Sequence, residues 1–310
     1  MLTEFYRDFP DDEACLVWLW NTRYAIDGGD TAFCERCEQV RVFKRYTAKQ
    51  QRQDWTCTGC GLHVHPTAGT IFHKSSTSLH LWFYAMYLMT STRAGISAKQ
   101  LERELGVTYK TAYRIFKLIR TELMSQDDEE PLSGEVEMDE MYVGGKLRQS
   151  DRAAYEFLPE GYQRRQTAQW IADQKKTPVF GMVERDGGRI RAMVVPDAKT
   201  VTLIPKVTEN VKPGTVVYTD DAKVYRNLPV SGFEHHSINH SARVYVSGET
   251  HTQTIEGFWS QVKRGIWGVH HNVSRKYLQM YLNEYVWRFN RRNGEQMFLA
   301  LAVRSSVPVK

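Results

Sequence analysis

The sequence predicts a chain of three parts that ends in an α/β domain with a mixed sheet. Four of its five cysteines form two close pairs, which is typical of a small metal-bound ribbon. A helical apolar period follows, and after residue 132 short strands alternate with helices. We therefore expect an N-terminal helix and ribbon in residues 1–75, a helical region in 76–125 and an α/β domain in 132–310.

Composition narrows the class of protein. The 310 residues are 42% hydrophobic and 25% charged, with a net charge of +5. Most of the chain is not expected to be disordered, because a chain of this composition can bury enough apolar surface to fold. The sequence has no apolar run near the ~18 residues that span a membrane, and its first residues lack a basic and apolar leader. We expect a cytoplasmic protein with no membrane partner.

The cysteine spacing predicts a zinc site. Cys34 and Cys37 form one pair, and Cys57 and Cys60 form the second, with nineteen residues between the two pairs. Each pair forms a tight turn, and two such turns complete a tetrahedral four-thiolate site whose Zn²⁺ is structural. A disulfide is the alternative, which a reducing cytosol disfavours. Three nearby histidines are less favoured substitute ligands: His63, His65 and His73. Cys15 is expected to be a buried core thiol.

Two basic surfaces are predicted in the N-terminal part. Five Lys or Arg residues, among them Arg45, lie between the cysteine pairs and could contact a DNA backbone, or could simply be the exposed edge of a ribbon. Further on, Leu79 to Met89 reads as a buried helix. Ser97 and Gln100 form a capping box for a second helix that ends at Gly106.

Thr108 can cap a third helix, so the pair fits a helix-turn-helix. An ordinary pair of packed helices is the alternative. In the helix-turn-helix reading, the second helix of the pair exposes four side chains suited to groove or phosphate contact: Tyr109, Lys110, Tyr113 and Arg114.

The C-terminal part alternates strands and helices. The predicted elements are a strand at 134–145, a hairpin at 178–195, a helix at 200–211, strands at 214–221 and 233–238, and helices from 254 onward. The opening strands are antiparallel and the later ones are joined by helices, so the sheet is mixed. A charged linker at 126–131 and a polar insertion at 147–176 fit no element.

Three carboxylates mark the ends of these elements. Asp139 lies near the end of the first strand, Asp220 ends a later strand, and Glu256 lies in the first turn of a helix. Such side chains can meet at one edge of a sheet, and their oxygens suit Mg²⁺ or Mn²⁺. Two ions ~3.5–4 Å apart would clamp the attacking and leaving oxygens of a phosphoryl transfer. Each acid alone is equally typical of a turn or a helix N-terminus, so spacing leaves both readings open.

A basic tail accompanies these acids. Residues 261–310 hold nine Lys or Arg and two acids. Lys263 lies two helical turns after Glu256, on the same face, and Arg264 follows, so a cation there could hold a phosphate beside the metals. A solvated basic helix face is the alternative.

The chain resembles a family. The segments VEMDEMYVGGK, KTPVFGMVERDGG, VVYTDDAKVY and HTQTIEGFWSQVKRG, in this order and preceded by GISAKQLERELGVTYKTAYR, resemble the zinc-ribbon DDE transposases of bacterial insertion sequences related to the eukaryotic Merlin elements. The resemblance extends from about Phe9 to Asn293. It implies an RNase H-like catalytic domain with Asp139, Asp220 and Glu256 as metal-binding triad and Lys263 as companion lysine.

The resemblance also separates two adjacent acids. It places the metal ligand directly after Thr219, at Asp220. Asp221 would point to the opposite side of an extended chain and would cap a short following helix.

The function implied is that of a DNA transposase. It would bind terminal inverted repeats, cleave DNA by two-metal hydrolysis and join the 3′-hydroxyl to target DNA by transesterification. Pairing two ends calls for a homodimer or larger assembly, at the bacterial nucleoid. Two alternatives are a non-catalytic zinc-ribbon and helix-turn-helix regulator, and an RNase H-like nuclease that never joins strands.

Overall fold

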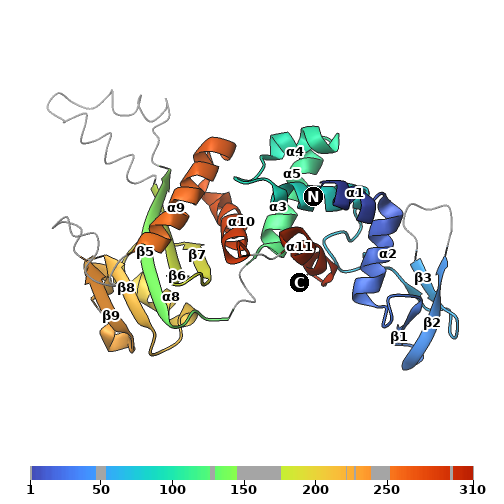
Figure 1. Cartoon of the computed structure of the whole chain (residues 1–310), viewed down its shortest axis with the longest axis horizontal. Coiled ribbons are helices and arrows are strands. Elements are labelled where there is room, and N and C mark those ends of the chain that lie inside the picture. The colour runs from blue at the N-terminus through green and yellow to red at the C-terminus, as the bar shows by residue number, and fades with distance from the viewer. Residues whose placement is uncertain are drawn as a thin grey trace. The chain divides into compact units, whose positions relative to one another are not determined.

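The computed structural model describes residues 2–46, 54–125, 130–144, 176–220, 222–226, 228–238, 252–293 and 296–309. They divide into an N-terminal unit, Met1–Met124 with Gly294–Lys310, and a sheet unit, Ser125–Asn293 (Figure 1). The division differs from the expected one in its last segment, because the final helix packs with helices of the N-terminal unit and not with the α/β domain.

The N-terminal unit combines helices with a small antiparallel sheet. Its helices are α1 (Leu2–Asp8), α2 (Asp12–Arg23), α3 (Leu79–Ser91), α4 (Ala98–Leu105), α5 (Tyr109–Leu118), the π-helical turn η1 (Ile119–Leu123) and α11 (Met297–Ser306). Its strands are β1 (Thr31–Cys34), β2 (Gln39–Tyr46), β3 (Asp54–Cys57) and β4 (His63–Val64), in the order β1-β2-β3-β4. The ribbon is held to α2 by Trp20 stacked on Trp55, with ring centroids 4.7 Å apart.

The boundaries of α4 and α5 follow from local signals. Ser97 accepts a hydrogen bond from the Gln100 backbone N–H, and Thr108 does the same for Thr111. Gly106 ends α4 in the left-handed region, with φ of 62°. The capping box is only half formed, because the Gln100 side chain donates to Glu104 and not back to the cap.

The sheet unit is a five-stranded mixed sheet with helices on both faces. Its elements are β5 (Glu135–Gly144), β6 (Lys176–Glu184), β7 (Ile190–Val194), α8 (Thr200–Asn210), β8 (Val216–Asp220), η2 (Lys223–Tyr225), η3 (Pro229–Ser231), β9 (Glu234–Ile238), α9 (Gln253–Gly265), the π-helical turn η5 (Ile266–His270), η6 (Arg275–Tyr277) and α10 (Leu278–Asn290). The strand order is β7-β6-β5-β8-β9. The pairs β5–β6 and β6–β7 are antiparallel, whereas β8 and β9 run parallel to β5, so the predicted mixed sheet is confirmed.

The two faces of the sheet carry separate cores. Val136 and Met138 of β5 belong to the core beneath α8, whereas Met141 and Val143 belong to the core beneath α9 and α10. This alternation follows from the two-residue period of a strand. It places Asp139 on the α9 side, although Asp139 lies in the middle of β5 and not near its end as expected, because the pairing with β6 extends the strand to Gly144.

Some expectations fall beyond the described residues or differ from them. Residues 126–129 of the expected linker, the insertion apart from its last residue, and Asp221 lie outside the described residues. The short helix expected after Asp221 is present as the 3-10 helix η2. Within the described ranges, every helix is too short or too polar to cross a membrane.

Candidate functional site

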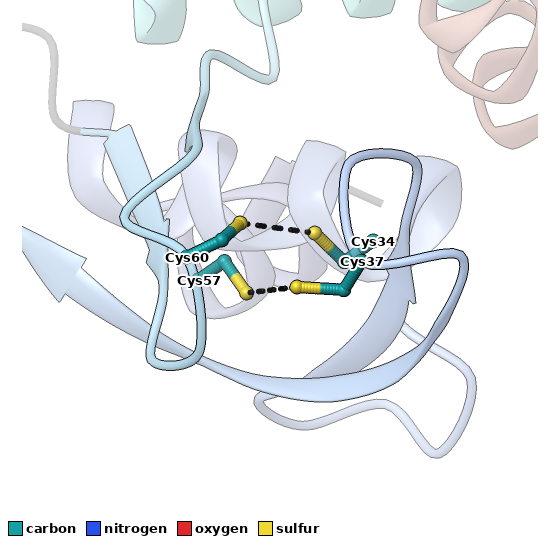
Figure 2. Close-up of side chains that lie close together, drawn as sticks. All are labelled: Cys34, Cys37, Cys57 and Cys60. Atoms are coloured by element: carbon teal, nitrogen blue, oxygen red, sulfur yellow. Dashed lines mark hydrogen bonds between the residues drawn. The ribbon is translucent and has the colours of Figure 1, made fainter.

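The four paired cysteines converge at one end of the ribbon (Figure 2). The Sγ atoms of Cys34 and Cys60 are 3.6 Å apart, those of Cys37 and Cys57 are 3.9 Å apart, and all four lie within 4.8 Å of one another. Thiolates bound to one tetrahedral Zn²⁺ at ~2.3 Å lie ~3.8 Å apart, so the arrangement fits that ion. All four are free thiols, which disfavours the disulfide alternative.

The thiols shift one another's pKa values in opposite directions, and hydrogen bonding with Cys60 raises the pKa of Cys37 to about 12. Although burial acts in the opposite direction, hydrogen bonds from the backbone N–H groups of Cys60 and Gly59 lower the pKa of Cys57 to about 6. A thiolate is the form that binds zinc, so this shift prepares the ligand. Cys15 is buried in α2, as expected for a core thiol.

The three histidines near the ribbon have other partners. The ring nitrogens of His63 and His65 lie 3.5 and 3.8 Å from an Asp54 carboxylate oxygen. The Nδ1 atom of His73 accepts a hydrogen bond from the Gly69 backbone N–H, at 3.1 Å. The ligand set that the described residues bring together is therefore the four cysteines.

The predicted acids gather at one edge of the large sheet. The register pairs Glu137 of β5 with Tyr218 of β8, and two further residues along each parallel strand bring Asp139 level with Asp220. Asp139 shares a pocket of about 530 Å³ with Glu256 of α9. The full lining comprises Asp139, Glu140, Met141, Glu256, Trp259, Ser260, Lys263, Arg264 and Trp267.

The carboxylates repel one another. Burial raises the pKa of Asp139 to about 6, and the charges of Asp220 and Glu256 contribute to the rise. Burial likewise raises the pKa of Glu140 to about 7, against the stabilising hydrogen bond from the Tyr225 hydroxyl at 2.6 Å. Oxygen ligands whose negative charges are held together in this way fit a divalent cation such as Mg²⁺ or Mn²⁺, which would offset the repulsion.

A glycine makes room for the aromatic wall of this pocket. Gly181 of β6 pairs with Asp139, and a Cβ atom there would lie 2.4 Å from the Trp259 ring. Trp259 therefore packs directly on the strand beside Asp139. The Trp259 side chain favours the charged form of the Asp139 carboxyl and so lowers its pKa, but less than burial raises it.

Glu137, which the sequence pattern did not single out, fixes α9 against the sheet. This fully buried carboxylate accepts hydrogen bonds from the Ile255 backbone N–H at 3.0 Å and from the Thr254 hydroxyl at 3.1 Å. It also accepts one from Arg185 Nε at 3.2 Å. Because Ile255 directly precedes Glu256, the contact sets the start of the helix that carries the third acid.

Arg185 extends this support to the next strand. Its guanidinium lies 3.5 Å from the centroid of the Tyr218 ring. Tyr218 belongs to β8 and lies two residues before Asp220. The pair Glu137 and Arg185 therefore connects the elements that carry all three acids. A signal was visible in the sequence, since Glu137 lies two residues before Asp139 on the same strand face, but an acid in an alternating strand reads as an exposed position.

The two expected basic residues of α9 line the same pocket. Lys263 and Arg264 are both exposed, and Arg264 donates a hydrogen bond to the Ser260 hydroxyl at 3.1 Å. Glu256 accepts from the Thr252 hydroxyl at 3.4 Å. The structure therefore brings Asp139, Glu256, Lys263 and Arg264 to one pocket, with Asp220 within electrostatic range.

The candidates in the N-terminal unit lie on two elements. On α5, Tyr109, Lys110 and Arg114 are exposed and Tyr113 is half-buried; the two tyrosine rings stack at 6.0 Å. Arg45 is engaged within its unit. Its guanidinium pairs with Glu13 at 2.7 Å and lies over the Trp55 ring.

Comparisons with known proteins identify the family of this chain. Residues 131–290 match the model of the ISXO2-like transposase domain. The chain is 30% identical over 260 residues to an uncharacterized protein in transposable element ISH50 of Halobacterium salinarum, covering 83% of this chain and 84% of that one. It is 35% identical over 102 residues to an uncharacterized transposase-like protein of Haemophilus influenzae, covering 33% of this chain and 81% of the relative.

A solved structure is also similar in part. A chain of the simian T-cell lymphotropic virus intasome with PP2A regulatory subunit B56 gamma matches with a TM-score of 0.32 and 11% identity, over 68% of this chain and 70% of that one. That score is too low to establish a common fold. The family match spans more than half of the sequence, and the resemblance expected from the sequence motifs is confirmed. The chain therefore belongs to the ISXO2-like transposases.

Proposed function

We propose that this chain catalyses both DNA cleavage and strand joining for an insertion sequence, as a DDE-type enzyme. The observation that carries the proposal is the meeting of Asp139 and Glu256 with Lys263 in one pocket, with Asp220 at the level of Asp139 on the neighbouring strand. Bound Mg²⁺ or Mn²⁺, as two ions, would activate the attacking water or 3′-hydroxyl and stabilise the leaving oxygen.

The residues of the chain have separate roles in this proposal. The three carboxylates hold the cations, and Glu137 with Arg185 keeps their elements in register. Lys263 and Arg264 bind backbone phosphates beside the reacting group. The order β7-β6-β5-β8-β9, with three antiparallel strands followed by two parallel ones, supports an RNase H-like fold for the sheet unit.

End recognition is assigned to the N-terminal unit. Its α4 and α5 helices, joined through Gly106, act as a helix-turn-helix whose exposed α5 face contacts the terminal repeat. Zinc bound by the four cysteines stabilises the ribbon, which adds backbone contacts. Two DNA ends must be held together for joining, so the active form is a homodimer or larger assembly, acting in the bacterial cytoplasm at the nucleoid.

The test uses inverted-repeat DNA taken from either side of the coding region. Purified full-length protein is incubated with labelled duplex ends, supercoiled target plasmid and Mg²⁺ or Mn²⁺, and products are resolved on a denaturing gel. Cleaved ends joined to plasmid are expected with the parent protein. Nicks without joined products would support a nuclease, and bound but intact ends would support a regulator; either result contradicts the proposal.

Asp139→Asn is the inactive comparison in that assay. It removes one carboxylate charge while nearly preserving side-chain volume, so it should keep end binding and lose both reactions. A matched control is Asp197→Asn, which changes an acid at the start of the segment before α8, where it pairs with Lys199 and Thr202. That variant should react like the parent.

A further inference from the structure

An exposed tryptophan lies in the wall of the acid pocket. Trp267 is 58% exposed, and it lines the pocket together with Asp139, Glu256, Lys263 and Arg264. In the described part of the chain it is the only tryptophan that is exposed; the others are buried or half-buried. Single exposed apolar residues are common on protein surfaces. The unusual feature is therefore the position of this exposed indole, in a pocket that also holds three carboxylates and two basic side chains.

Four residues that line this pocket lie on one face of α9 and of the turn that follows it. Glu256, Ser260, Lys263 and Trp267 follow one another at intervals of three or four residues, so they share one helical face. The face therefore presents a carboxylate, a hydroxyl, an ammonium group and an indole in sequence. At ~1.5 Å per residue, Trp267 lies ~6 Å beyond Lys263 along the axis.

The backbone under Trp267 is held firmly. Gly265 and Ile266 are buried, and a Cβ atom at Gly265 would lie 1.8 Å from the Tyr285 hydroxyl oxygen of α10, so the two elements approach as closely as glycine allows. The indole is carried by the π-helical turn Ile266–His270. On its far side Gly268 has no heavy atom within 4 Å of where a Cβ would lie, which leaves that side open.

We propose that Trp267 is a base-stacking subsite that binds an unpaired nucleobase of the DNA strand whose phosphate Lys263 or Arg264 holds. This inference rests on the proposed function. An indole offers a flat apolar face to the π-face of any base, so the contact is tolerant of sequence. Nucleotides rise 3.4 Å along a duplex strand. The ~6 Å between Lys263 and Trp267 therefore places the indole within one or two nucleotides of the held phosphate.

The subsite would help to open the DNA end. A base that leaves the stack has an unfavourable free energy of a few kcal/mol, and a waiting indole offsets part of it. The strand near the scissile phosphate could then approach the carboxylates without its partner strand. An alternative occupant of Trp267 is a second copy of this chain in the assembled complex, and the experiment separates the two.

The experiment is a double-substitution cycle between protein and DNA. Trp267→Ala and Trp267→Phe are compared with the parent in cleavage of duplex ends, and a single abasic site is moved through the last positions on either side of the cleavage point. Stacking is worth ~1–3 kcal/mol per base, so Trp267→Ala should slow cleavage roughly 5- to 150-fold. Trp267→Phe should retain most of the rate. At one position the abasic site, which leaves no base to unstack, should restore most of the lost rate to Trp267→Ala and should not slow the parent.

Controls keep the outcomes distinct. Val201→Ala removes an even more exposed apolar side chain from α8 and should behave like the parent. Trp267 is exposed, so its replacement should leave the unfolding temperature unchanged. An unfolding temperature equal to that of the parent would show that the variants are folded.

Equal rates for Trp267→Ala and the parent would overturn the subsite. The subsite would also be overturned if Trp267→Ala failed to assemble and an abasic site changed nothing at any position. That result would assign Trp267 to a contact with a second copy of the chain. If the parent itself neither cleaves nor joins, and Asp139→Asn makes no difference, the proposed function fails instead.

Discussion

The ribbon and the sheet each gather candidate metal ligands, but by different means. In the ribbon, two tight turns bring four thiols within 4.8 Å, and in the described residues this is the only group of three or more Cys, His, Asp or Glu ligands that converges so closely. On the sheet, the acids come from β5, β8 and α9, which lie up to 117 residues apart in sequence. The first site is built by local chain geometry and the second by topology.

The difference has an energetic consequence. The ribbon has a small core around Trp20, Phe43 and Trp55, so we expect its fold to depend on a bound metal. The acid site belongs to a unit with two large cores, and there the repulsion between carboxylates opposes folding when no cation is bound. Metal binding should therefore be a requirement for folding in the ribbon and for activity in the sheet unit.

Loss of zinc should give the largest effect and should be confined to one region. Structural zinc contributes ~10–16 kcal/mol in small zinc domains, so Cys57→Ser should unfold the ribbon. Hydrogen exchange is the measurement, with fast exchange expected in residues 31–46 and 54–64. Protection of β5 and β6 should be unchanged. Slow exchange throughout the ribbon of a protein shown to be zinc-free would contradict the comparison.

Glu137→Ala should give the next largest effect. Removing one partner of a buried ion pair costs ~3–5 kcal/mol, and here it leaves Arg185, whose side chain is only 7% exposed, without that carboxylate. Urea unfolding of the sheet unit measures the loss. The matched control is Glu135→Ala, since Glu135 pairs with the same arginine but is 43% exposed and should contribute under ~1 kcal/mol. Similar losses for both variants would mean that Glu137 does not anchor α9.

Asp139→Asn should stabilise the protein when Mg²⁺ and Mn²⁺ are absent. The folded-state pKa of Asp139 is raised from 3.8 to about 6, so the folded state favours the protonated form. Its stabilising contribution is present below pH ~4 and is lost as the pH rises through ~6. The variant should therefore gain up to ~3 kcal/mol over the parent at pH 7.5 and nothing at pH 3.5. Thermal unfolding of both proteins at the two pH values measures this difference in stability. No chelator is added, because a chelator would also remove the zinc. A gain in stability that is the same at both pH values would contradict the prediction.

Lys110→Ala and Arg114→Ala should give the smallest effect, on binding alone. Each removes one exposed cation from α5. If each contacts a phosphate, affinity for the DNA end should fall similarly for all sequences, and the slope of log affinity against log salt should decrease by about one unit. Fluorescence anisotropy at several salt concentrations measures both. Parental binding at every salt concentration would leave the α4–α5 pair as scaffold.

What the sequence predicts well is set by neighbouring residues. The ends of α4 and α5 follow from Ser97, Gly106 and Thr108, and the cysteine cluster follows from two pairs of fixed spacing. The end of β8 at Asp220 is also predicted, whereas Asp139 lies in the middle of β5, because pairing with β6 carries that strand on to Gly144.

What the sequence does not predict depends on distant partners. Glu137 looks like an exposed strand residue until α9 is placed above it, 117 and 118 residues later. Arg45 finds Glu13, 32 residues earlier. The apolar side of α11 indicates that this helix packs against other elements, but the sequence does not indicate that those elements belong to the N-terminal unit.

The central claim is that the carboxylates at the sheet edge perform the DNA chemistry, and two adjacent acids test it most directly. Asp220→Asn and Asp221→Asn are compared in the joining of pre-cut ends to a target plasmid, with end binding measured in parallel. We expect Asp220→Asn to bind ends but give no joined product, and Asp221→Asn to join them like the parent. Joining by Asp220→Asn, with Asp221→Asn inactive under the same metal conditions, would contradict the assignment.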